Sequence, residues 1–173
     1  MSIYLILSLV GAAVFSLGVA AIVLRFGIPP SLSETFYLLG GRKGKGFIFY
    51  LWLAVVVFVM LIPMVQAAGF WGFICGVGLL FVGAAPAFKK EDDEEDKGSI
   101  EPIIHPIAAL LSAFSAVMQL VKIREWGWML VSAFFAWCVA YVTMTMRKSY
   151  IFWLEMAAFY GLFAGMIVHY LKM

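Results

Sequence analysis

Three ionisable side chains, His105, Glu155 and His169, lie within long apolar stretches of the sequence. The amides of Gln66 and Gln119 lie in similar surroundings. Polar groups inside a bilayer are costly, so each is a candidate for proton relay or for binding an ion or substrate. A carboxylate and an imidazole at the same depth would suit a proton-coupled carrier, and Glu155 with His105 is the pair that could supply it.

Each of these groups also has a structural interpretation. Glu155 could hold helices together by pairing with His105, Arg147 or Lys148, which we expect at nearby depth. His105 could satisfy free backbone groups at a helix start, because it lies close to two prolines. His169 is one turn from the end of its apolar stretch and could face interfacial water.

The elements that position these groups are predicted to be transmembrane helices. Of the 173 residues, 65% are hydrophobic and 13% are charged, against about 45–50% and about 25% in soluble domains. A helix needs about 20 mostly apolar residues to cross a bilayer. Six segments qualify, and they predict an all-α integral membrane bundle in a single domain, residues 1–173: about 3–25, 47–66, 69–88, 103–121, 127–146 and 150–171.

The basic residues in the loops predict the orientation, because Lys and Arg favour the cytoplasmic side. With the N-terminus outside, nine of them are cytoplasmic: Arg25, Arg42, Lys43, Lys45, Lys89, Lys90, Lys97, Arg147 and Lys148. Three are then outside: Lys122, Arg124 and Lys172. Both termini are therefore expected outside the cytoplasm. In this orientation Glu155 and His105 share a level near the cytoplasmic face, and His169, Gln66 and Gln119 form a second layer near the other face.

Two predicted cytoplasmic loops have features of their own. After Pro29-Pro30, the run Ser31-Leu32-Ser33-Glu34 fits a capping box and predicts a short surface helix over about 31–39. The basic residues that follow it, Arg42, Lys43 and Lys45, are candidates for binding lipid headgroups. The second loop, 89–101, is acidic, and its contiguous acids lack the alternating ligands of a calcium loop.

Small residues recur at four-residue spacing in several spans. They let helix backbones approach closely in lipid. We therefore expect a compact bundle, and a homo-oligomer is a further possibility through the faces formed by Gly161, Gly165, Gly72 and Gly76.

Several classes of function lack their sequence signatures. The net charge of +2 does not indicate a nucleic-acid partner. There is no Cys/His cluster, dinucleotide fingerprint or nucleophile elbow, so we expect neither a metal nor a cofactor and assign no catalytic residue. Membrane lipids are the expected partners.

Part of the chain resembles a known family. Val82-Gly83-Ala84-Ala85-Pro86, followed after a loop by His105 and Ala109, resembles the Val-Gly-x-x-Pro and His-x-x-x-Ala motif of a widespread bacterial family of polytopic membrane proteins of unknown function. Eukaryotic DRAM-type membrane proteins are distantly similar. The resemblance implies a multi-pass protein of the bacterial inner membrane. Members of that family often carry an Asp after the proline, whereas Ala87 and Phe88 follow it here.

Three functions are compatible with these features. The first is a non-enzymatic protein that binds or senses a lipid or small apolar ligand, or serves as a membrane partner. The second is a small proton-coupled transporter that uses Glu155 and His105. The third is a lipid-processing metallohydrolase, a class whose zinc-binding members use several histidines, of which this chain has two.

Overall fold

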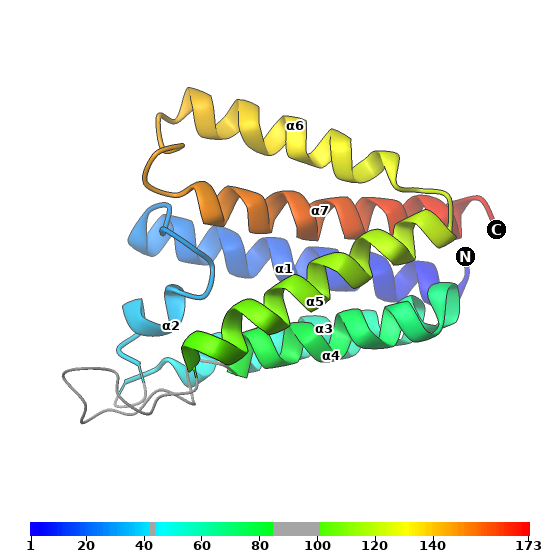
Figure 1. Cartoon of the computed structure of the whole chain (residues 1–173), viewed down its shortest axis with the longest axis horizontal. Coiled ribbons are helices and arrows are strands. Elements are labelled where there is room, and N and C mark those ends of the chain that lie inside the picture. The colour runs from blue at the N-terminus through cyan, green and yellow to red at the C-terminus, as the bar shows by residue number, and fades with distance from the viewer. Residues whose placement is uncertain (42–43, 85–100) are drawn as a thin grey trace.

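The chain folds into a bundle of helices that follow the apolar segments of the sequence. The computed structural model describes residues 1–41, 44–84 and 101–173. Within these residues every regular element is a helix (Figure 1): α1 (Ile3–Phe26), α2 (Thr35–Leu38), α3 (Phe47–Ala68), α4 (Phe70–Ala84), α5 (Glu101–Lys122), α6 (Gly127–Val142) and α7 (Tyr150–Leu171). The predicted all-α bundle is confirmed.

Four of these helices, α1, α3, α5 and α7, are long and apolar enough to cross a membrane. The other two apolar helices are shorter, with 15 residues in α4 and 16 in α6. At 1.5 Å per residue they reach about 23 Å, compared with about 30 Å for the hydrocarbon core. The protein is therefore a membrane-embedded helical bundle, in which four of the described helices have the length and composition of a full span.

The helices pack as antiparallel neighbours. Figure 1 shows α3 and α4 side by side, α5 crossing obliquely next to them, and α6 lying along α7 at the outer edge of the bundle. The N- and C-termini lie at one end together with the α3–α4 and α5–α6 turns. The α1–α3 and α6–α7 connections lie at the other end. The two groups of loops thus lie at opposite ends of the bundle.

Two predicted boundaries were wrong. The segment predicted at 127–146 ends at Val142, because the chain turns there and Met144 has a left-handed φ of 55°. The surface helix predicted at 31–39 has only four α-helical residues, Thr35–Leu38. Its apolar side chains Leu32 and Phe36 are buried in the protein core, so this segment packs against the bundle itself.

The start of α2 retains half of the predicted capping box. The Ser31 hydroxyl accepts a hydrogen bond from the Glu34 amide at 3.3 Å. Ser31→Ala removes this acceptor, and we expect it to destabilise the turn by about 1 kcal/mol, the usual effect of losing an N-cap. Hydrogen–deuterium exchange of residues 32–38 measures the change. Exchange as slow as in the wild-type protein would show that the cap contributes nothing.

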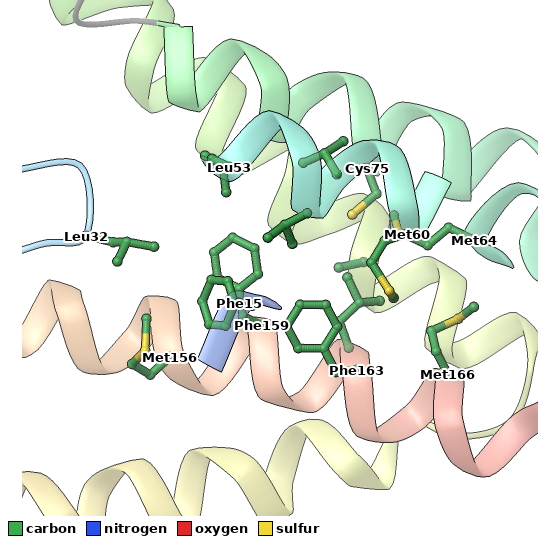
Figure 2. Close-up of a cluster of buried hydrophobic side chains, with 14 of the residues drawn as sticks. Phe15, Leu32, Leu53, Met60, Met64, Cys75, Met156, Phe159, Phe163 and Met166 are labelled. Carbon is green, nitrogen blue, oxygen red and sulfur yellow. The ribbon is translucent and has the colours of Figure 1, made fainter. Parts of the chain in front are cut away.

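The core lies where α1, α3 and α7 meet. Phe15 of α1 is fully buried, and its ring centroid lies 4.4 Å from that of Phe159 and 5.5 Å from that of Trp52. Figure 2 shows Phe15, Phe159 and Phe163 together, with methionines from α3 and α7 around them. The Trp52 indole also donates to the Val14 carbonyl at 3.0 Å. Stacked rings and one satisfied indole N–H therefore join α1, α3 and α7.

The four glycines predicted to support an oligomer are instead buried within the chain. A side chain added at Gly72 or Gly76 of α4 would collide with α3. One added at Gly161 would collide with α6, and one at Gly165 would collide with Leu120 of α5. These small-residue faces are occupied by contacts among the described helices of the same chain.

Candidate functional site

Glu155 lies in the second turn of α7, beside the segment that follows α1. One carboxylate oxygen, Oε2, accepts a hydrogen bond from the Leu32 amide at 2.6 Å. Two further bonds attach the same segment to α7: the Phe152 amide donates to the Pro30 carbonyl at 3.1 Å, and the Ser149 hydroxyl donates to the Ile28 carbonyl at 3.4 Å. Gly27 ends α1 with a φ of 76°, and Pro29 and Pro30 then direct the chain across the start of α7. Glu155 is thereby held at the end of the bundle that contains α2.

A groove lies between α4, α5 and α7, and Glu155 forms part of its wall. We call it the Glu155 groove; its volume is about 500 Å³. The remaining wall is formed mainly by apolar or small residues, including Cys75, Leu79, Pro106, Ala109, Ser112, Ala158 and Leu162. The Ser112 hydroxyl donates to the Ala108 carbonyl of its own helix at 2.7 Å, so it adds little polarity. Among the described lining residues, Glu155 is the one carboxylate.

The Glu155 groove opens to the side of the bundle. Leu110 and Leu154 lie at its rim and are 71% and 65% exposed. On a membrane-embedded helix such side chains contact lipid tails rather than water. A ligand could therefore enter from the bilayer, and the groove volume is within the range of about 300–1,000 Å³ typical of small-molecule sites.

One partner of Glu155 was not predicted. The donor that the structure shows is the backbone amide of Leu32, whereas the sequence pointed to side chains. Glu155 is half-buried and lies in the wall of the groove, near one end of the bundle. His105 is half-buried on α5, next to Pro106, which lines the groove. The groove therefore brings Glu155 and the start of α5 together.

The second predicted polar layer does not form a single site. Gln119 is fully buried, and its Nε2 donates to the Met166 sulfur at 2.7 Å. Its Oε1 has no hydrogen-bond partner among the described residues. Gln66, by contrast, is exposed on α3. His169 is half-buried, and its ring centroid lies 5.1 Å from that of Tyr170. These three residues lie near the same end of the bundle without converging on a cavity.

An ion pair at that end was not predicted from the sequence. Glu125, in the α5–α6 turn, is buried and accepts from Lys172, with 2.5 Å between Oε1 and Nζ. Lys122 caps α3 by donating to the Ala68 carbonyl at 3.1 Å. Both contacts connect turns and helix ends, which indicates a structural role. The only sequence signal was one acid among the three basic residues assigned to this side.

The predicted headgroup-binding residues are described only in part. Arg42 and Lys43 lie outside the described residues, as does the acidic loop up to residue 100. Lys45 is exposed just before α3, where a lysine could meet a headgroup.

The described residues contain no group of three or more His, Cys, Asp or Glu side chains placed to hold a metal ion. The metallohydrolase alternative therefore gains no support from them. Comparisons with protein-family models, with curated proteins and with solved structures give no match for this chain. Of the motif that resembles a bacterial family, residues 85–88 lie outside the described residues.

Sequence reasoning missed the groove itself. Its walls include Ala109, Ser112, Ala113, Ala116 and Ala158, which come from two helices. Small residues at four-residue spacing were interpreted as close helix contacts. Where two helices instead diverge, the same small side chains leave space between them, and periodicity alone does not separate the two outcomes.

Proposed function

We propose that this chain is a non-enzymatic membrane protein that binds a lipid or a small apolar ligand in the Glu155 groove. The observation that carries the proposal is a lateral apolar groove of about 500 Å³ whose wall contains a single carboxylate. An apolar body would be held by the Leu and Ala side chains. Burying that surface would contribute about 25 cal/mol per Å².

The carboxylate specifies the class of ligand. Oε2 of Glu155 already accepts from Leu32, and a carboxylate has two oxygens that accept hydrogen bonds. Oε1 is therefore suited to a ligand with one donor group. We propose a long hydrocarbon ligand with a hydroxyl or an amine at its polar end, which would lie beside Glu155 at the α2 end of the bundle.

Photo-cross-linking tests this proposal. The probe is a long-chain alcohol with a diazirine on its chain, applied to the purified protein in micelles. We expect labelled peptides from α4, α5 and α7, and we expect Ala109→Phe, which fills the groove, to reduce labelling about tenfold. The matched control is Ala133→Phe, because Ala133 is exposed on α6 and does not line the Glu155 groove.

The methyl ether of the same probe tests the contribution of Glu155. It keeps the chain but lacks the O–H donor, so we expect about fivefold to tenfold weaker labelling, equivalent to one lost hydrogen bond. Labelling spread evenly over all helices, or equal labelling of Ala109→Phe and Ala133→Phe, would contradict the proposal.

A proton-coupled carrier is a second candidate, supported by the position of Glu155 in the wall of a groove within the bundle. In this case Glu155→Gln is expected to abolish pH-dependent flux in proteoliposomes and to leave folding intact. A protein that only binds its ligand would transport nothing, either as the wild type or as Glu155→Gln. Transport by the wild-type protein, measured with and without a pH gradient, therefore separates the two functions.

We also propose that the membrane is the bacterial inner membrane and that both termini lie outside the cytoplasm. The nine-to-three distribution of basic residues supports this orientation. In a background with Cys75→Ala and Cys138→Ala, Ser2→Cys should react with an impermeant maleimide in intact cells. Lys148→Cys should react only after lysis. The reverse pattern would overturn the orientation.

A further inference from the structure

A second groove lies on the other side of α7, between α1, α6 and α7. Its volume is about 740 Å³, and its walls include Val19, Val131, Phe135, Ala136 and Ile167. The Ser132 and Thr143 hydroxyls along it already donate to helix carbonyls, to Ala157 at 2.6 Å and to Val139 at 2.8 Å. The Tyr160 hydroxyl donates to the Ser16 hydroxyl at 3.2 Å. This α6 groove therefore presents an almost wholly apolar wall.

The α6 groove is long enough for an acyl chain of one leaflet. It extends along α6 from Trp128 to Thr143, which is about 22 Å at 1.5 Å per residue. One leaflet contributes about half of the 30 Å hydrocarbon core. Val131, Phe135 and Val139 line the groove and are 42%, 62% and 45% exposed, so the wall is open to lipid.

Three cationic side chains lie at the end of the bundle where this groove reaches Ile28 and Thr143. Arg25 is in the last turn of α1, three residues before the lining residue Ile28. Arg147 and Lys148 precede Ser149, whose hydroxyl bonds to Ile28 in the groove wall. All three cations are exposed, and none forms an ion pair with a carboxylate in the described part of the chain.

We propose that the α6 groove binds an anionic phospholipid, with an acyl chain along α6 and the phosphate at Arg25, Arg147 and Lys148. Charge complementarity identifies the occupant, because an apolar channel that ends near three exposed cations matches a hydrocarbon chain that ends in an anion. Arginine adds bidentate hydrogen bonding to phosphate oxygens. This site is separate from the Glu155 groove and does not depend on the function proposed for it.

Lipid retention measured by native mass spectrometry tests the proposal. The protein is reconstituted in nanodiscs of equal parts phosphatidylglycerol and phosphatidylcholine with identical chains, and then released into mild detergent. We expect retained phosphatidylglycerol to exceed phosphatidylcholine by on the order of 10-fold to 100-fold, because each basic residue near the surface strengthens anionic lipid binding. The triple variant Arg25→Gln, Arg147→Gln, Lys148→Gln should retain both lipids equally.

Two phenylalanine substitutions on α6 separate binding of the acyl chain from binding of the headgroup. Ala136→Phe fills the α6 groove and should abolish retention of both lipids, whereas Ala133→Phe, on the same helix outside the groove, should retain them like the wild-type protein. Equal retention of the two lipids by the wild-type protein, or an undiminished preference in the triple variant, would overturn the proposal.

Discussion

Replacing Gly72 by alanine is expected to lower the free energy of unfolding by about 3 kcal/mol, near the upper end for overpacking a tight contact. Gly72 lies in the first turn of α4, against the last turns of α3. A Cβ there would overlap the carbonyl group of Met64, which is backbone and cannot turn aside as a side chain would. The α3–α4 hairpin would have to open along its length. Titration with denaturing detergent in mixed micelles measures the loss.

The control is Gly127→Ala at the start of α6, where an added Cβ has no neighbour within 4 Å. That change should be neutral or stabilising by up to about 1 kcal/mol, because alanine favours helix more than glycine does. Equal effects of the two substitutions would show that close contact between α3 and α4 is not what constrains Gly72.

Glu155→Leu is expected to cost about 2 kcal/mol relative to Glu155→Gln. The glutamine side chain keeps an oxygen that can accept from the Leu32 amide, whereas leucine leaves that donor without its acceptor. An unsatisfied buried donor costs about 1–3 kcal/mol. The comparison uses two uncharged variants, so the cost of burying a charge does not enter it. Detergent titration gives the global difference.

Amide exchange gives the local effect of the same pair of variants. We expect the exchange of residues 28–34 in Glu155→Leu to be about 30-fold faster than in Glu155→Gln, the factor that corresponds to 2 kcal/mol. Matching exchange in the two variants would show that the carboxylate does not hold this segment on α7.

The long apolar helices could be predicted from composition because lipid requires about 20 apolar residues for each span. The α3–α4 turn was likewise evident, since only two residues separate the predicted segments 47–66 and 69–88. In the structure Gly69 has a left-handed φ of 61° there. The end of α6 was not evident, because residues 143–146 have no breaker such as glycine or proline and the chain turns there with Met144 in a left-handed conformation. Helix ends of this kind depend on tertiary packing.

The candidate site could be predicted in part. The rarity of carboxylates in spans identified Glu155, and the topology gave its approximate depth. Its partner could not be predicted, because the Leu32 amide belongs to the backbone and carries no signature in the sequence. The glycine faces were identified correctly as contacts, but spacing did not reveal that α3, α5 and α6 of the same chain would cover them.

The most direct test of the proposed function is equilibrium binding of a radiolabelled long-chain alcohol to the purified protein in micelles, compared with Ala109→Phe and Ala133→Phe. The Glu155 groove predicts saturable binding of one ligand per chain to the wild-type protein and to Ala133→Phe, and affinity at least about tenfold weaker for Ala109→Phe, a loss of about 1.4 kcal/mol. Binding that does not saturate, or equal affinity in all three proteins, would contradict the assignment of this groove as the ligand site.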